Sequence, residues 1–196
     1  GIGDKHVPWI HNVRNTDFVV AVDDEDCMDV LRLFNEPEGV SFLTGRGVPE
    51  AFASRLDLVG ISGIGNIIAA VKFARYLELT ESDAVFTILT DSMELYRSRT
   101  AELAAERGRF TREEAAAVLR KSLHGQGLDN MAELGYYDRL RIHNLKYFTW
   151  IEQQGRQLGE LNEQWYRKDY WTRVQALTPE IDALITAFNR DSGAAP

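Results

Sequence analysis

The sequence predicts an α/β protein: a parallel sheet with flanking helices over residues 1–99, followed by an all-helical extension over residues 100–196. Three short apolar runs, bounded by acidic or turn-forming residues, favour strands. Amphipathic stretches follow the first two of these runs, and strands that alternate with helices are typical of a parallel sheet. The predicted strands are residues 17–22, 58–61 and 84–89, and the predicted helices are about 26–35 and 64–78.

The composition is that of a globular protein and argues against several classes. Hydrophobic residues make up 44% and charged residues 27% of the chain, so a buried core can form. The net charge of -8 argues against nucleic acid as a partner, because phosphate binding needs clustered Lys and Arg. No apolar run reaches the roughly 18 residues that span a bilayer. We therefore expect no membrane partner and a cytoplasmic protein, and the single cysteine, Cys27, cannot form an internal disulfide.

The two ends of the first predicted helix have different characters. The acids Asp23-Asp24-Glu25-Asp26 are typical of a helix start, where they favour the positive end of the dipole. That interpretation is preferred to a metal site, and Cys27 beside it is expected to be packed. Further on, Gly45, Gly47 and Pro49 interrupt any regular element, which predicts a loop with a short helical turn over 41–58.

The second half is predicted to be helical. Thr111-Arg112-Glu113-Glu114 fits a capping box before a helix that runs to Leu123 and ends near Gly125. Apolar residues between Leu140 and Ile151 recur on one long helix, and Thr178-Pro179 opens a last helix to about Asn189. An aromatic tail should pack against the α/β body or a second subunit: Trp150, Trp165, Tyr166, Tyr170 and Trp171.

A glycine-rich segment, Gly60-Ile61-Ser62-Gly63-Ile64-Gly65-Asn66, is the strongest local signal for a ligand site. A turn of small residues between a strand and a helix brings a ligand close to unpaired N–H groups. The order of the glycines is neither the dinucleotide pattern nor a P-loop. Asp91, at the end of the next predicted strand, keeps a Rossmann-like nucleotide-binding domain as an alternative. Ser62 could also be a simple N-cap.

Three segments of the chain resemble motifs of one enzyme family. Gly60-Ile61-Ser62, followed by residues 69–74, is similar to "GISSGAAVAAALKLA", and residues 85–96 are similar to "VVTILPDSGERY". The opening Gly1-Ile2-Gly3, with Val7-Pro8 and the strand and acidic helix start that follow, resembles "GIGAGFVP…ITVTDEEA". With the motifs in the right order and at plausible spacing, residues 1–99 resemble the carboxy-terminal part of the cysteine synthase and cystathionine β-synthase family of fold-type II pyridoxal-phosphate enzymes.

The resemblance implies a cofactor site for pyridoxal 5′-phosphate. In the family, the serine matching Ser62 hydrogen-bonds the pyridine nitrogen of the cofactor. A neutral hydroxyl leaves the ring a weaker electron sink than a carboxylate would, which suits β-elimination and β-replacement on a serine-like amino acid. The resemblance places Gly60, Gly63, Asp91 and Ser92 beside the cofactor, and Gly1 and Gly3 beside the substrate.

Other features depart from the family. Gly63-Ile64-Gly65-Asn66 replaces "SGAA", Thr90 stands where the family has Pro, and residues 41–58 look longer than the usual link. The Schiff-base lysine and the main phosphate loop of the family lie upstream of any residue here. Lys72 matches a lysine on the helix after the serine loop, and we expect it at the surface. The other four lysines match no catalytic position: Lys5, Lys121, Lys146 and Lys168.

Two classes of function follow. The first is a segment of a pyridoxal-phosphate lyase or transferase that acts on a small amino acid. It would be completed by an amino-terminal segment or a second subunit, and it would form a homo-oligomer. The second is a non-catalytic binding or regulatory module with the same half-fold, beside the nucleotide-binding alternative. The missing initiator Met suggests a processed product or a fragment. The histidines show no paired spacing, so no zinc site is expected: His6, His11, His124 and His143.

Overall fold

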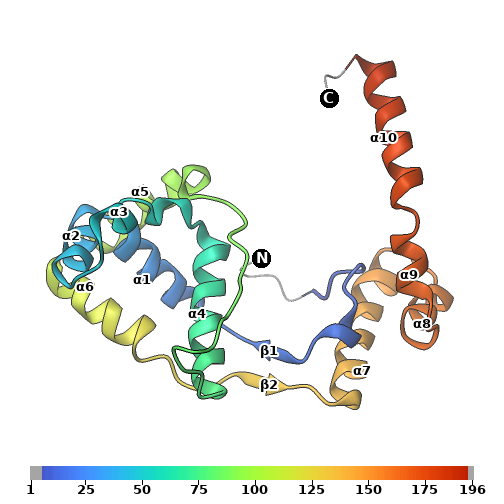
Figure 1. Cartoon of the computed structure of the whole chain (residues 1–196), viewed down its shortest axis with the longest axis horizontal. Coiled ribbons are helices and arrows are strands. Elements are labelled where there is room, and N and C mark those ends of the chain that lie inside the picture. The colour runs from blue at the N-terminus through green and yellow to red at the C-terminus, as the bar shows by residue number, and fades with distance from the viewer. Residues whose placement is uncertain (1–5, 194–196) are drawn as a thin grey trace. The chain divides into compact units, whose positions relative to one another are not determined.

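The computed structural model describes residues 6–193, and this part of the chain is mostly helical (Figure 1). Helix makes up 64% of the structure, and its described strands, β1 (Phe18–Val20) and β2 (Met131–Glu133), form a two-stranded antiparallel sheet. Backbone bonds flank the pair, from the Ala21 N–H to the Asn130 carbonyl at 2.9 Å and from the Leu134 N–H to the Asp17 carbonyl at 2.8 Å. The predicted parallel sheet with flanking helices is therefore wrong.

The described chain divides into two compact units. Unit 1 comprises residues 19–132, and unit 2 comprises residues 6–18 with 133–193. This division differs from the predicted boundary after residue 99. Residues beyond that boundary belong to unit 1 because Leu103, Phe110, Ala115 and Val118 are buried in the same apolar core as the first helix.

Unit 1 is a group of helices around α1 (Asp24–Asn35). Helices α2, α4, α6 and η4 contact α1 (Figure 1), whose Val30, Leu31 and Leu33 are fully buried. Burial of such aliphatic side chains is the main stabilising contribution to a core of this kind. The other elements are α2 (Pro37–Gly45), α3 (Glu50–Ala53), η2 (Leu56–Leu58), α4 (Ile61–Tyr76), η3 (Met93–Tyr96), α5 (Arg97–Arg107), α6 (Arg112–Val118) and the π-helix η4 (Leu119–Leu123).

The helix starts of unit 1 were the most accurate predictions. The Asp23 carboxylate caps α1 by accepting from the Glu25 N–H at 2.8 Å, with three acids in the first turn. The capping box of α6 is also present. The Thr111 hydroxyl accepts from the Glu114 N–H at 3.2 Å, and the Glu114 carboxylate accepts from the Thr111 N–H at 2.6 Å. Both starts are encoded by local hydrogen bonds that short sequence patterns specify.

Three other predictions for unit 1 are wrong. Residues 58–61 form no strand: η2 ends at Leu58, and α4 begins at Ile61, so the glycine-rich segment is the first turn of a helix. Residues 41–58 are mostly helical, because α2 continues to Gly45 and α3 and η2 follow. Residues 84–89 run without turn, bend, helix or strand. An apolar run of four residues cannot by itself distinguish a strand from a buried helical segment.

Unit 2 combines residues 6–18 with the last four α-helices. Its elements are η1 (Val13–Asn15), α7 (Tyr136–Asn144), the π-helix η5 (Tyr147–Gln153), α8 (Leu158–Tyr166), α9 (Tyr170–Gln175) and α10 (Thr178–Ser192). Its buried apolar side chains include Trp9, Val13, Leu161 and Trp165. The last helix was predicted correctly, whereas the predicted long helix is interrupted between α7 and η5, and β2 breaks the predicted all-helical extension.

No single helix among the described residues has the length and apolar character needed to cross a bilayer. One pair of segments, Glu50–Leu58 and Ile61–Tyr76, passes the test together by length and composition, but it is bent by 119°.

Candidate functional site

The amino terminus of α4 brings two of the predicted site segments into contact. The Gly60 N–H donates to the Asp91 carbonyl at 2.9 Å. A Cβ atom on Gly60 would lie 2.0 Å from the Asp91 Oδ1 atom, so only glycine fits at this position without a shift of that side chain. Gly60 is also the N-cap of α4, so Ser62 is the second helical residue and not the N-cap considered from the sequence.

The Asp91 carboxylate is held on one side only. The Tyr96 hydroxyl donates to its Oδ2 atom at 2.6 Å, and this hydrogen bond to a carboxylate raises the pKa of Tyr96. The Oδ1 atom is buried and has no hydrogen-bond partner among the described residues. Leaving such an acceptor unpaired is costly, and functional sites are one place where such costs occur.

A pocket of about 620 Å³ opens beside Ser62. The half-buried Ser62 and Tyr96 both line it, so the glycine-rich segment and the segment after Asp91 contribute to one cavity. Carboxylates from the start of α1 and the guanidinium of Arg99 give its wall both signs of charge. The other lining residues are Asp24, Glu25, Met28 and Ile61. No described lysine is among them.

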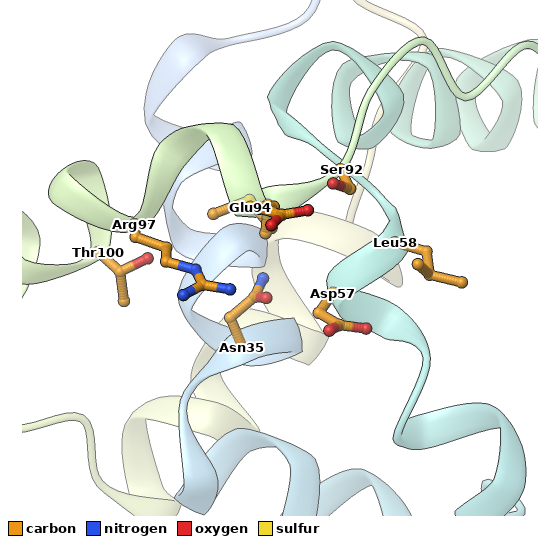
Figure 2. Close-up of a pocket in the computed structure, with 8 residues that line it drawn as sticks. Asn35, Asp57, Leu58, Ser92, Glu94, Arg97 and Thr100 are labelled. Carbon is orange, nitrogen blue, oxygen red and sulfur yellow. The ribbon is translucent and has the colours of Figure 1, made fainter.

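A separate pocket of about 450 Å³ is lined partly by residues of the η3 segment (Figure 2). Ser92 lines this pocket and not the pocket of Ser62. Asp57, Glu94 and Arg97 line it together with Asn35, Leu58 and Thr100. The structure thus divides the predicted cofactor-binding residues: Ser62 belongs to the first pocket, Ser92 belongs to the second, and Asp91 lies between them in sequence and contacts Gly60.

The remaining predicted residues have other places. Gly63 is buried, and a Cβ atom on it would lie 2.9 Å from Val59 Cγ1 and 3.3 Å from Leu89 Cδ2. Its role in this structure is the close approach of α4 to the chain beside it. Gly1 and Gly3, predicted beside the substrate, lie outside the described residues.

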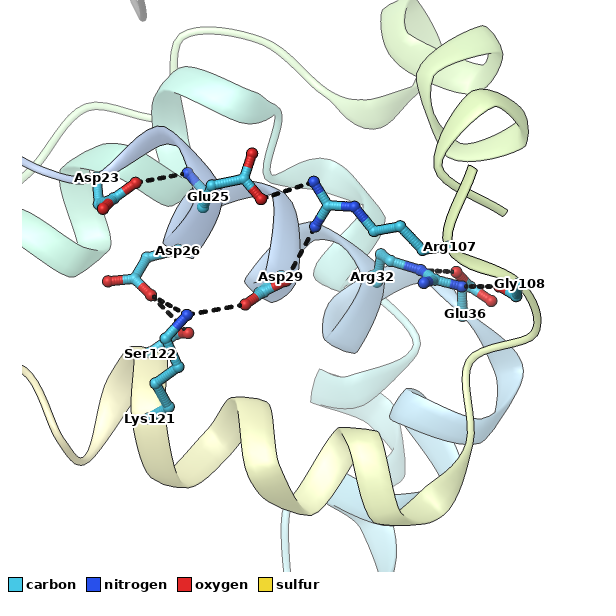
Figure 3. Close-up of polar contacts among 10 residues, drawn as sticks. All are labelled: Asp23, Glu25, Asp26, Asp29, Arg32, Glu36, Arg107, Gly108, Lys121 and Ser122. Carbon is cyan, nitrogen blue, oxygen red and sulfur yellow. Dashed lines mark hydrogen bonds and ion pairs between the residues drawn. The ribbon is translucent and has the colours of Figure 1, made fainter. Parts of the chain in front are cut away.

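The acids at the start of α1 are committed to a network of ion pairs (Figure 3). Arg107 bridges Glu25 at 2.7 Å and Asp29 at 3.2 Å, while Lys121 lies 3.5 Å from Asp26 and 3.4 Å from Asp29. Burial alone would raise the pKa of Asp26. Hydrogen bonds from Gln126 and Ser122 and the charge of Lys121 lower it overall. These contacts join α1 to α5 and to η4, which indicates a structural role.

Cys27 lies on the buried side of α1, as expected. Its exposed fraction is 1%, and burial, with nearby carboxylates, raises the pKa of its thiol to about 12. A thiol in that environment stays protonated and is a poor nucleophile.

Two of the described lysines, Lys72 and Lys146, are buried. Lys72 was predicted at the surface, but it is 3% exposed and donates to the Ala21 carbonyl at 3.2 Å, with Asp129 at 3.5 Å. In unit 2, Lys146 is fully buried. The burial of Lys146 was not predicted from the sequence. The signal for it was a charged residue among apolar neighbours such as Leu145 and Phe148.

Lys146 is enclosed by acceptors. Its Nζ atom donates to the carbonyls of Trp9 at 3.0 Å and His11 at 2.6 Å and to Gln164 Oε1 at 2.9 Å. It also lies 5.6 Å from the centroid of the Trp171 ring. Burial lowers the pKa of Lys146 to about 8. All three N–H donors of Lys146 are occupied within unit 2. Its amino group is therefore not available to a cofactor in this conformation.

Searches with protein-family models, among curated proteins and among solved structures find no match to this chain. The resemblance to the cysteine synthase family therefore depends on the three sequence motifs.

Proposed function

We propose that this chain supplies the ring-binding part of a pyridoxal-phosphate site and acts within an enzyme for β-elimination or β-replacement on a serine-like amino acid. The observation that carries the proposal is the pocket at the start of α4. Ser62 and Tyr96, from two motifs that resemble the family's, line that one cavity, and Gly60 and Asp91 are in direct contact.

The residues present fit one part of the cofactor. Ser62 is not the N-cap of α4, and it lines the pocket, where its hydroxyl could donate to a ring nitrogen. The first turn of α4 adds N–H groups and the positive end of a helix dipole. When bound, pyridoxal phosphate withdraws electrons from the α-carbon of an amino acid, and a neutral hydroxyl at its nitrogen keeps that withdrawal moderate. In this account Ser62 orients the ring, and Tyr96 holds Asp91 against Gly60.

The lysine of such a site would come from elsewhere. The pocket of Ser62 has no lysine among its described lining residues, and Lys72 and Lys146 are buried with other partners. We therefore propose that an amino-terminal segment or a second subunit completes the site, and that the working form is an oligomer. Exposed apolar residues of α10 support association: Ile181, Leu184, Ile185 and Phe188.

Two alternatives lead to different results. A Rossmann-like nucleotide-binding domain is built on a parallel sheet, as is the α/β domain that the family resemblance implied, and the described residues contain no such sheet. Neither candidate is therefore supported by the fold, and the proposal depends on the pocket of Ser62. A non-catalytic binding module would keep the helical units and bind no cofactor.

Equilibrium dialysis with pyridoxamine 5′-phosphate, ATP and NAD tests the proposal on the chain alone. Pyridoxamine phosphate carries no aldehyde, so its binding does not require the missing lysine. We expect weak saturable binding of pyridoxamine phosphate and none of the nucleotides. Binding of a nucleotide, or of none of the three, would contradict the proposal. Borohydride reduction with pyridoxal phosphate should label no single lysine preferentially, and selective labelling of Lys146 or Lys72 would contradict the missing-lysine argument.

A further inference from the structure

Residues 84–90 of unit 1 form an apolar segment without regular structure, and every residue of it is exposed to solvent. Its sequence, Ala-Val-Phe-Thr-Ile-Leu-Thr, has no charge, no proline and no glycine. Phe86 is 94% exposed and Ile88 is 74% exposed, and Val85 and Leu89 are about half exposed. Segments of this composition have a high tendency to pair as strands, and proteins normally cover them.

The backbone of this segment is as open as its side chains. Among the described residues, no backbone–backbone hydrogen bond involves residues 84–90. One side lies beside α4, where the Asn66 amide donates to the Ile88 carbonyl at 2.8 Å and Leu89 lies against Gly63. In an extended chain the polar groups of successive residues point to opposite edges. The groups of Val85, Thr87 and Leu89 therefore face away from the edge that Asn66 contacts.

We propose that residues 84–90 form a docking edge, to which a partner polypeptide adds one strand. The backbone groups of the partner would pair with those of Val85, Thr87 and Leu89, and its apolar side chains would cover Phe86 and Ile88. This is the strand-addition mode of peptide recognition, in which the main chain supplies affinity and the side chains supply specificity.

The charges around the edge define the partner. Between residues 76 and 96 the chain carries acids and no Lys, Arg or His. Asp83 and Asp91 flank the docking edge in the sequence, and the Asp91 carboxylate is also held by the Tyr96 hydroxyl. The others are Glu78, Glu81 and Glu94. The partner strand is therefore apolar in its middle and carries Lys or Arg at its ends, since opposite charges on paired strands are stabilising.

The same charges oppose a second copy of this chain as the occupant. Antiparallel pairing of two copies about Thr87 places Asp83 of one copy opposite Asp91 of the other. Parallel pairing in register places each acid beside its own equivalent. Like charges directly opposite on paired strands are destabilising. This interaction does not depend on the cofactor, because no residue of the docking edge lines the pocket of Ser62.

Hydrogen exchange of the full chain tests the edge with a defined probe. The probe is a synthetic peptide with the core Val-Thr-Val-Thr-Val and lysines at both ends, and its matched control carries glutamates at both ends. In the free monomer we expect the amides of residues 85–89 to exchange rapidly. The lysine peptide should slow this exchange, and the glutamate peptide should bind at least about tenfold more weakly.

Three variants test where and how the lysine peptide binds. Phe86→Lys, in the docking edge, should abolish binding of the lysine peptide. Phe52→Lys is the matched control, because Phe52 is 63% exposed on α3 and lies outside the edge, and this variant should bind normally. The double variant Glu81→Gln/Glu94→Gln should weaken binding of the lysine peptide and reduce its salt dependence.

Four results would overturn the proposal. The first is slow exchange at residues 85–89 in the monomer, which would mean that the chain covers its own edge. The second is a stable dimer that Phe86→Lys dissociates, which would make a second copy the occupant. The third is equal protection by the lysine and glutamate peptides, and the fourth is no protection by either.

Discussion

Replacing Lys146 with Met removes the central polar contact of unit 2. Met is similar in length, but it leaves the carbonyls of Trp9 and His11 and the amide oxygen of Gln164 without their donor. Each buried acceptor left unpaired costs about 1–3 kcal/mol. Relief from the desolvation of a buried charge offsets part of that sum. We expect unit 2 to lose about 1–3 kcal/mol of unfolding free energy on balance.

Tryptophan fluorescence reports this change in one unit. All four tryptophans, Trp9, Trp150, Trp165 and Trp171, lie in unit 2, so a urea titration followed by their emission measures that unit separately from unit 1. The control is Lys168→Met, because Lys168 is exposed and should change stability by less than about 0.5 kcal/mol. If Lys146→Met unfolded at the same urea concentration as the Lys168 variant, the role given to the buried lysine would be wrong.

The pH dependence of the same transition follows from the pKa of Lys146. Burial lowers that pKa from 10.5 to about 8, so the folded state releases its proton before the unfolded state does. Between these two values the unfolded state binds more protons, and the contribution of Lys146 to stability therefore rises with pH. In Lys146→Met this rise between pH 8 and pH 10.5 should be absent. An identical pH profile in the parent and the variant would contradict the assignment.

Three further predictions concern unit 1, and circular dichroism or thiol titration checks them. Thr111→Ala removes one half of the capping box of α6 and should cost about 0.5–2 kcal/mol in urea unfolding, whereas no loss would mean that the box does not form in solution. Gly39→Ala places a Cβ atom 2.2 Å from the Leu33 carbonyl oxygen and should cost about 1–3 kcal/mol of unfolding free energy or more. The control is Gly159→Ala in unit 2, whose added Cβ atom meets no atom within 4 Å, so it should be neutral or slightly stabilising. The Cys27 thiol should react with a disulfide reagent only after denaturation, and fast labelling of the native chain would contradict its burial.

Local sequence patterns predicted the starts of three helices, but they missed α3 and most of α2. The starts of α1, α6 and α10 depend on caps, first-turn acids or an early proline, and each of these acts within one helical turn. The body of α4 was also predicted, although the helix begins earlier than expected, at Ile61. Glycine costs helix stability, yet Gly63 is tolerated because it lets α4 approach Val59 and Leu89 closely.

The sheet could not be predicted reliably from such patterns. Residues 84–89 have the composition of a strand, but a strand needs a partner, and pairing is a tertiary property that no local pattern contains. Residues 17–22 do contain a strand, β1, but it pairs antiparallel with β2, whose residues Met131–Glu133 carry only a weak strand pattern.

The candidate site was predicted in part. The contact between Gly60 and Asp91 connects two segments that the sequence had singled out separately. The separation of Ser62 and Ser92 into different pockets was not predictable, because it depends on the short helix η3 between Ser92 and α5. The burial of Lys72 likewise depends on distant acceptors, Ala21 and Asp129, which no spacing on α4 reveals.

The central claim is that the Ser62 hydroxyl binds a pyridine nitrogen, and a comparison of two serine variants tests it most directly. Ser62→Ala and Ser92→Ala each remove one hydroxyl, but only Ser62 lines the pocket at the start of α4. Ser92 makes no capping hydrogen bond and Ser62 is not the N-cap of α4, so both variants should keep the far-ultraviolet spectrum of the parent. Binding of pyridoxamine 5′-phosphate is measured by isothermal titration calorimetry. We predict that Ser62→Ala binds about 3–10-fold more weakly, as the loss of one hydrogen bond of about 0.5–1.5 kcal/mol implies, and that Ser92→Ala binds like the parent. Equal affinities of the parent and Ser62→Ala, or a loss confined to Ser92→Ala, would contradict the claim.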